Sequence, residues 1–515
     1  MRPKPRSECE DVAMRKRSVT PDREEDHNFV ATLRKGTTVI RGVVCKIWLP
    51  RRVSDEVVMR LYPSGSRRAI EELRPPFAMR GKIRGFDPSD VTEISASEVW
   101  TPIARTRHHG RSRSETVVET DPMDLQILQK RPREKILRRM RVHTIYLLTR
   151  CPPLTPFAIR TVSYTGEITM GKVHEVEFTL ACGAHLRFAN HFRYEDREDG
   201  TLTYPELVAT HEHEVLARDF ARLDERILRE LDDFLALVGF GARYRAACLR
   251  VDRSSEHADT FCFYRNNVTI PTAEDFDFNQ TVIDLSDFKE FLPAAYEQLV
   301  ASGPDDLLLH ALHVIPPRAE RTAESEFVSL YSALESIVLW YRRRRALEFI
   351  IDDVEVWRTL QRDVRSLLKE HLLLKGNERP QKERLKMILR KVGELRRVPF
   401  GVALEKFCEE YRVKLDDLWP VIGNGPDEIS LTDIRNRLVH GSTLTGRQFH
   451  AFIGAKQHMR WVVERALLGV FGWPLERSKV RPDFLARNLT AMIELAQDRQ
   501  DMKRGFGLNL ASAGA

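Results

Sequence analysis

The stretch EFVSLYSALESIVLWYRRRRALEF, residues 326–349, decides the fold of the C-terminal half of the chain. Its apolar residues recur every three or four positions, from Phe327 through Leu334 to Tyr341, and this period predicts an α-helix with one face turned to a core. Four arginines follow at 342–345, and cations favour a helix C-terminus because they complement the helix dipole. The stretch therefore predicts a buried helix with a basic end.

More helices are expected around this one. From about Ser286 onward most segments have a helical period, and the connections contain the Gly, Asn and Pro residues that end helices. Antiparallel helices of this length predict a bundle over 301–480, followed by a C-terminal helix and tail over 481–515. The expected helical segments are 352–373, 383–397, 404–413, the residues after Ser430, and 447–473.

The N-terminal half is expected to be rich in β-strands. After a flexible arm over 1–27, short segments of β-branched and aromatic residues are separated by Gly, Pro or Asn clusters, a pattern typical of antiparallel strands. A basic, Ser-rich stretch at 104–122 predicts an internal linker or surface loop. The expected strand segments are 37–50, 56–63, 142–150, 174–188, 242–251 and 259–264.

One long amphipathic helix interrupts the strands. Around His211 the apolar period changes from two to about 3.6, and it continues to a break at Gly239 and Gly241. The predicted fold class is therefore α+β. A β-rich N-terminal domain over 28–300, with an embedded long helix, precedes an all-α helical bundle.

Composition excludes several classes of protein. The 515 residues are 42% hydrophobic and 30% charged, which describes a globular protein. No apolar run approaches the roughly 18 residues of a membrane span, and the N-terminus lacks the apolar core of a secretory signal, so we expect a cytoplasmic location and no membrane partner.

No metal or cofactor is expected from the sequence. The seven cysteines are widely spaced, odd in number and without a C-x-x-C pair, which argues against a disulfide framework or a thiolate zinc site. The histidine pairs at 211–213 and 108–109 lack a third ligand at a metal-binding spacing. There is no Gly-rich phosphate loop, so neither ATP nor NAD is expected.

Positive charge is concentrated in one helical segment. The formal net charge is +7, and nine Lys or Arg residues stand against three Glu between Lys375 and Arg397. This segment either binds RNA phosphates or forms a solvated helical face whose apolar residues, Ile388 and Leu395 among them, turn to a core. The expected RNA-binding residues are Lys382, Arg384, Lys386, Arg390 and Lys391.

The segment SLTDIRNRLVHGST, residues 430–443, differs from the other helices in its polar face. It begins with Ser430 and Asp433 in the pattern of a capping box, and a glycine follows its last residues, so a helix of about three turns is predicted. Asn436 and His440 are four residues apart and share one face. Asp433 and Arg437 lie beside that face, and the opposite side is apolar with Leu431, Ile434 and Leu438.

Arg435 adds a phosphate-binding group to the same helix. It lies about 140° round the helix from His440, so the two residues serve one site only if the arginine side chain curls or the site is shared by two chains. An imidazole moves protons near neutral pH, a guanidinium holds a phosphate, and a carboxamide orients both. These groups predict RNA cleavage without a metal, with the 2′-OH of the RNA as nucleophile. The competing interpretation of His440 is a helix-terminal histidine that complements the dipole.

The same residues resemble the signature of the HEPN (higher eukaryotes and prokaryotes nucleotide-binding) superfamily. That signature is an arginine, a polar residue, a few further residues and a histidine on a late helix, matched here by Arg435, Asn436 and His440. The segment SLYSALESIVLWY, residues 329–341, is similar to the first bundle helix of the ApeA-like branch and includes Glu335. The resemblance is strongest over residues 303–475.

The resemblance implies a metal-independent endoribonuclease that acts as a homodimer or higher homo-oligomer and leaves a 2′,3′-cyclic phosphate. It assigns general acid/base catalysis to His440, phosphate and transition-state stabilisation to Arg435, and orientation of both to Asn436. Glu335, Asp433 and Arg437 are expected as neighbours of the site. ApeA-like proteins are associated with abortive-infection defence, which implies a toxin that cleaves tRNA or another structured RNA after a phage-derived trigger reaches the β-rich sensory half.

The alternative is a protein without catalytic activity. In that interpretation the bundle is a dimerisation module that binds RNA or protein, and the β-rich half binds a partner. A separate antitoxin is a further alternative that the sequence leaves open. Cleavage of RNA in the presence of EDTA separates the enzyme from the binding module.

Overall fold

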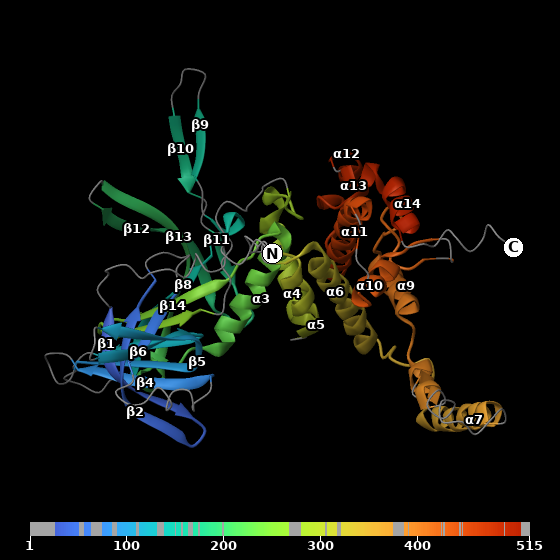
Figure 1. The fold of residues 1–515 in the computed structure, drawn as a ribbon. Coiled ribbons are helices and arrows are strands. Elements are labelled where there is room, and N and C mark those ends of the chain that lie inside the picture. Colours follow the sequence, from blue (N-terminus) through green and yellow to red (C-terminus); the bar gives the residue numbers. More distant parts are fainter. Residues whose placement is uncertain are drawn as a thin grey trace, which may run out of the picture.

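The computed structural model describes most of the chain between residues 26 and 505. The β-rich N-terminal region, blue to green, and the helical C-terminal region, yellow to red, meet at helices α3 and α4 (Figure 1). The expected flexible arm lies outside the described residues except for its last two positions. The described residues are 26–50, 56–62, 75–84, 90–109, 113–130, 138–149, 151–155, 158–162, 168–173, 176–197, 200–266, 280–303, 306–316, 321–373, 386–389, 391–423, 425, 428–441, 444, 446–488 and 490–505.

An antiparallel sheet dominates the N-terminal half, as the strand pattern predicted. Within the described residues it has the order β11-β12-β13-β8-β14-β15-β7-β5-β4-β1-β2-β3-β6, and β9 and β10 form a separate hairpin that projects from it (Figure 1). The bounds are β1 (His27–Lys35), β2 (Thr38–Trp48), β3 (Val58–Tyr62), β4 (Phe77–Arg84), β5 (Val91–His109), β6 (Arg113–Pro122), β7 (Asp124–Lys130), β8 (Arg139–Leu148), β9 (Ala158–Val162), β10 (Ile168–Val173), β11 (Val176–Thr179), β12 (His185–Arg197), β13 (Gly200–Leu216), β14 (Cys248–Ser255) and β15 (Thr260–Arg265).

One end of the sheet closes into a barrel. In the described part of the chain, β5 pairs with β4 on one side and with β6 on the other, so β5, β4, β1, β2, β3 and β6 form a closed ring. Alternate residues of each strand point inward, and the barrel interior holds its own buried cluster, with Leu33, Cys45, Ile47 and Met59 almost free of solvent. Closure leaves these six strands without an unpaired edge within the ring.

The linker expected at 104–122 is wrong. Residues 104–109 end β5 and residues 113–122 form β6, and the two strands pair in antiparallel register. Val117 and Val118 are both buried although successive strand residues point to opposite faces, so both faces of β6 are covered at this point.

The long helix begins later than expected. The residues from His211 to Leu216 complete β13, and helix α3 (Glu225–Ala242) starts at Asp224, whose carboxylate accepts hydrogen bonds from the backbone N–H groups of the first helical turn. The helix also continues through both glycines that were expected to break it. At Gly241 a Cβ atom would lie 2.9 Å from the ring of Phe288, so this glycine permits close packing of α4.

The C-terminal half is helical, and the expected helices are confirmed with shifted ends. Of the segment 383–397, only residues 386–389 and 391–392 are described as helix, followed by a 3₁₀ turn at Gly393–Arg396. The other bounds are α4 (Phe288–Ala301), α5 (Asp306–Val314), α6 (Ala323–Arg344), α7 (Val354–Leu373), α9 (Phe400–Tyr411), α10 (Leu431–Val439), α11 (Gly446–Val470), α12 (Pro482–Asn488), α13 (Thr490–Ile493) and α14 (Leu495–Gly505).

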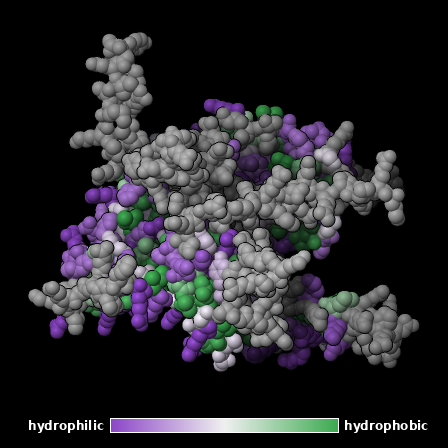
Figure 2. Space-filling model, turned by 60° about the vertical axis from the view of Figure 1, so that its left-hand side comes forward, coloured by the Kyte–Doolittle hydropathy of each residue, from purple (hydrophilic) through white to green (hydrophobic). Residues whose placement is uncertain are grey.

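The two halves share a core. Buried residues form one continuous cluster from the inner face of the sheet through α3 and α4 into the bundle. An ion pair also joins them, because Arg243 at the end of α3 donates from Nε and Nη2 to both carboxylate oxygens of Glu464 on α11, at 2.7 and 2.6 Å. The Glu464 side chain is fully buried. On the face seen in Figure 2, hydrophobic patches interrupt a hydrophilic surface.

Candidate functional site

The helix that carries the motif, α10, is started by a complete capping box. The Ser430 hydroxyl oxygen accepts the backbone N–H of Asp433 at 3.2 Å, and the Asp433 carboxylate accepts the backbone N–H of Ser430 at 3.0 Å. The predicted start of the helix is therefore confirmed. The Asp433 carboxylate also accepts the Ser430 hydroxyl at 2.7 Å, so this expected site neighbour is engaged in building the helix end.

The apolar side of α10 anchors it in the bundle. Leu431 and Ile434 are fully buried, as predicted, and Leu438 is partly buried. The preceding segment adds two backbone hydrogen bonds, from the N–H groups of Leu431 and Thr432 to the carbonyls of residues 420 and 421. These contacts anchor the start of α10 to the segment that precedes it.

Arg435 turns toward α6 and lies in a polar cluster. Its Nη2 is 3.8 Å from Oε1 of Glu335, and its Nη1 donates to Oδ1 of Asn436 at 3.2 Å. The guanidinium carbon lies 5.6 Å from the ring centre of Tyr331, within the range of a cation–π contact. The structure thus brings together three predicted residues, Arg435, Asn436 and Glu335.

Tyr331 and Thr432 support this cluster and were not anticipated as part of it. The Tyr331 hydroxyl is 2.8 Å from Oγ1 of Thr432, which in turn donates to the carbonyl of Val421 at 2.6 Å. Burial raises the pKa of Tyr331, and the nearby carboxylate of Glu335 adds to this rise. The sequence could have indicated Tyr331 as a neighbour of the site, because it precedes Glu335 by four residues and therefore lies on the same face of α6.

His440 is exposed at the C-cap of α10. Its backbone N–H donates to the carbonyl of Asn436 at 3.0 Å, and Gly441 follows with φ +82°, the left-handed conformation that favours glycine. Asn436 is also exposed, and Arg437 is partly buried. The imidazole of His440 is therefore open to a ligand from solvent.

The basic segment after α7 is described only in part. Lys386 and Lys391 are exposed, as RNA-binding residues would be, whereas Lys382, Arg384 and Arg390 lie outside the described side chains. The core side expected for this helix is wrong in two places, since Ile388 and Leu395 are exposed, the latter by 63%. Helix α7, which precedes this segment, extends away from the bundle (Figure 1).

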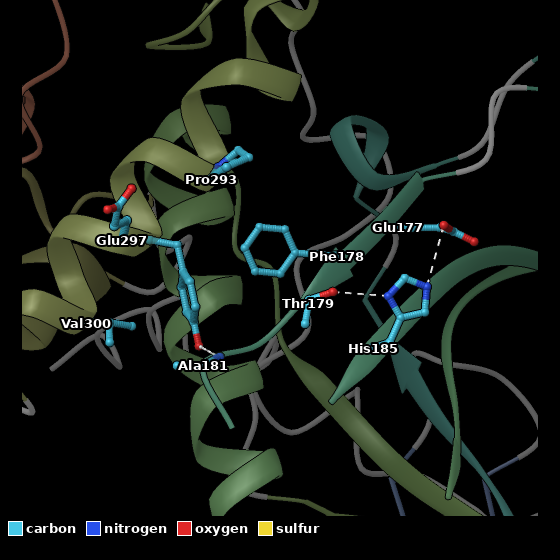
Figure 3. A pocket seen from close by; sticks show the side chains of 9 residues that line it. Glu177, Phe178, Thr179, Ala181, His185, Pro293, Glu297 and Val300 are labelled. Carbon is cyan, nitrogen blue, oxygen red and sulfur yellow. Dashed lines mark hydrogen bonds and ion pairs between the residues drawn. The ribbon is translucent and has the colours of Figure 1, made fainter. Parts of the chain in front are cut away.

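A cavity of about 480 Å³, away from α10, lies between the β11–β12 hairpin and α4 (Figure 3). Phe178 and Tyr296 form its apolar wall, with Glu177 and Glu297 at its edges. Burial raises the pKa of Tyr296 to about 12, and its hydroxyl accepts the backbone N–H of Ala181 at 3.3 Å. Its walls and carboxylates suit an apolar group that carries a positive charge.

Comparison with known proteins gives no relative to this chain. No family model matches the sequence, and neither a curated protein nor a solved structure matches it. None of the helices in the described ranges combines the length and the apolar character needed to cross a bilayer.

Proposed function

We propose that this chain is a metal-independent endoribonuclease of the HEPN kind, acting in the cytoplasm on tRNA or another structured RNA in abortive-infection defence against phages. The observation that carries the proposal is the combination on α10 of an exposed imidazole, His440, with a guanidinium, Arg435, that Asn436 holds on the same helix. Anionic RNA phosphates attract the guanidinium, and the imidazole is the group that exchanges protons near neutral pH.

The reaction follows from these groups. A base removes the proton of a ribose 2′-OH, and the oxygen attacks the adjacent phosphorus. The bond from phosphorus to the 5′-oxygen breaks, and an acid donates a proton to that oxygen. The products are a 2′,3′-cyclic phosphate and a 5′-hydroxyl, and Arg435 stabilises the negative charge that grows on the phosphate oxygens.

This reaction favours a dimer. One imidazole cannot both accept the first proton and donate the second in a single step, whereas His440 residues from two chains can divide these tasks. Apolar side chains at the C-terminal end of the motif and shortly after it are available for such an interface. Val439 is 52% exposed and Phe449, in the first turn of α11, is 44% exposed.

The test is cleavage of purified tRNA in EDTA by the wild-type protein and by His440→Ala. The substitution removes an exposed side chain, so the fold and the oligomeric state should be unchanged. We expect cleavage by the wild type only, and about 100-fold or greater loss in the variant. Equal cleavage by both proteins would refute the role of His440.

A non-catalytic protein-binding module is the second candidate. The observation that favours it is helix α7, which extends away from the bundle (Figure 1) and exposes Val356, Leu360 and Leu367. These residues are spaced by four and seven positions, so they share one face of the helix, and such a face commonly contacts another protein. Failure of the purified protein to cut RNA in EDTA, whether or not it retains the RNA, would favour this non-catalytic candidate.

A further inference from the structure

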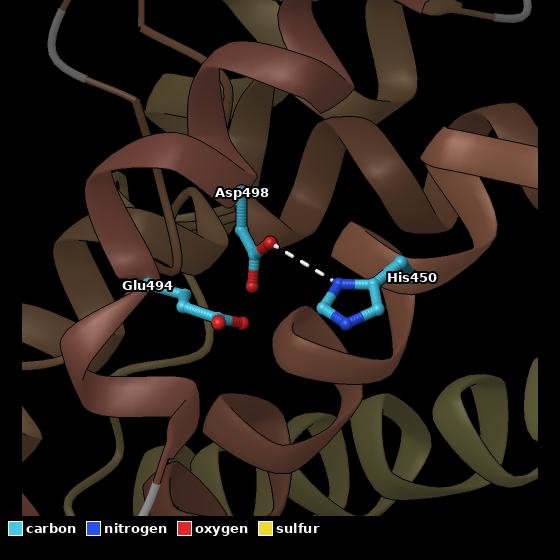
Figure 4. Close-up of side chains that lie close together, drawn as sticks. All are labelled: His450, Glu494 and Asp498. Atoms are coloured by element: carbon cyan, nitrogen blue, oxygen red, sulfur yellow. Dashed lines mark ion pairs between the residues drawn. The ribbon is translucent and has the colours of Figure 1, made fainter.

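Three potential metal ligands that are distant in the sequence meet where α14 packs on α11. His450 lies near the start of α11, Glu494 immediately precedes α14, and Asp498 lies in the first turn of α14. One ligand atom from each lies within 4.8 Å of the other two, and the three side chains point toward a common space (Figure 4).

The carboxylate of Asp498 is buried beside the imidazole of His450. The Asp498 side chain is only 7% exposed, and its Oδ1 lies 3.7 Å from Nδ1 of His450, which is longer than an ordinary hydrogen bond. A buried carboxylate normally has donors or a cation beside it, because its desolvation is costly.

The backbone of α11 is shaped for this carboxylate. A Cβ atom on Gly454 would lie 2.3 Å from Oδ2 of Asp498, so the carboxylate fits against the helix only because residue 454 is glycine. Glu494 and His450 are more exposed and can adjust. The geometry is a fixed buried oxygen with two movable ligands around it.

We propose that His450, Glu494 and Asp498 bind a divalent transition-metal ion, with Zn²⁺ as the best fit, and that this ion fastens α14 to α11. An imidazole nitrogen with two carboxylates favours Zn²⁺ over Mg²⁺ or Ca²⁺, which prefer oxygen ligands alone. In a tetrahedral zinc site with bonds of about 2.0–2.1 Å, ligand atoms are about 3.4 Å apart. The three ligand atoms now lie within 4.8 Å of one another, so the site requires the His450 and Glu494 side chains to rotate toward Asp498.

This site differs from the sequence expectation that no metal is bound. His450 on α11 is far in sequence from Glu494 and Asp498, so the three ligands do not form a recognisable metal-binding motif in the sequence. The site takes no part in the cleavage proposed above, and a metal-binding measurement therefore tests it separately.

The test measures Zn²⁺ binding to the metal-free full chain by calorimetry. We compare the wild type with His450→Ala, Asp498→Asn and the control His310→Ala, which removes an exposed histidine on α5. We expect the wild type and the control to bind one more tight Zn²⁺ than the two site variants, or to bind it about 100-fold more tightly. Zinc should raise the thermal midpoint of the wild type and the control only.

Two results overturn the proposal. One is a wild-type protein that binds no Zn²⁺. The other is binding of equal strength and number in the wild type and in His450→Ala, because the zinc would then be held by other histidines or cysteines. Since His450 is 74% exposed, its removal leaves the fold intact even if Asp498→Asn does not fold. The proposal would likewise be wrong if the variants lost stability to the same extent with and without zinc, because the three residues would then form an ordinary ion pair.

Discussion

Replacing Glu335 with Gln separates two roles for this residue. Glu335 lies 3.8 Å from Nη2 of Arg435, so it partly neutralises the guanidinium that is proposed to hold the RNA phosphate. If Glu335 only weakens the positive field of the Arg435 guanidinium, Glu335→Gln strengthens RNA binding. If it contacts the RNA or moves protons itself, the substitution weakens binding or cleavage.

The size of the effect follows from the geometry. Glu335 is 44% exposed and Arg435 is 32% exposed, so the pair lies in a water-like dielectric. Two unit charges at this separation interact by about 1 kcal/mol in water, which corresponds to at most about sixfold in affinity. Salt screens exposed charges, so the effect should be larger at low ionic strength than at 0.15 M. The fold should lose less than about 1 kcal/mol, because exposed ion pairs contribute little.

The assay is fluorescence anisotropy with labelled tRNA, in a His440→Ala background that prevents cleavage. Glu405→Gln is the matched control, since it removes the same charge from an exposed position on α9. We expect the protein with Glu335→Gln to bind tRNA up to about sixfold more tightly than the protein with Glu335 unchanged, and the control variant to change binding far less. Weaker binding by Glu335→Gln, or an equal gain in both variants, would contradict the reasoning.

Three further predictions concern the scaffold. Arg243→Ala leaves the buried carboxylate of Glu464 without its partner, so the free energy of unfolding in urea should fall by about 3–5 kcal/mol. The control Arg218→Ala, at an exposed position, should lower it by less than about 0.5 kcal/mol. A loss below about 1 kcal/mol for Arg243→Ala would count against a buried pair. Ser430→Ala removes the cap of α10 and should cost about 1 kcal/mol in the same assay, and no change would mean that the capping box does not stabilise the helix. Burial lowers the pKa of His213 to about 4, and His211 and Arg253 add to the decrease. Between pH 6.5 and 4 the unfolded chain therefore binds more protons than the folded chain, and the free energy of unfolding falls as the pH falls through that window. His213→Gln should flatten this part of the stability profile, and an unaltered slope would contradict the prediction.

Local patterns predicted elements well where one face of an element is buried. The alternation in 142–150 gave β8, and the spacing of Phe327, Leu334 and Tyr341 gave α6, because in both cases burial follows a period of two or 3.6. The capping residues of α10 were equally readable, since the pattern Ser430 to Asp433 is local. These features need no knowledge of distant neighbours.

Features that depend on long-range contacts were missed. The barrel closes because β5 pairs with both β4 and β6. The sequence of a strand does not reveal which other strands it pairs with. The start of the long helix was misplaced because Val215 fits the apolar period of the helix as well as that of β13. The approach of Tyr331 to Thr432 at the candidate site, and of Asp498 to His450 at the proposed metal site, joins segments far apart in sequence.

Catalysis of RNA cleavage by His440 is tested most directly by sequencing RNA ends after induced expression of the wild type and of His440→Ala. We expect new fragments with 2′,3′-cyclic phosphate ends in cells that express the wild type and none above background with the variant. The same fragments in both cultures, or 3′-hydroxyl ends in the wild type, would contradict it.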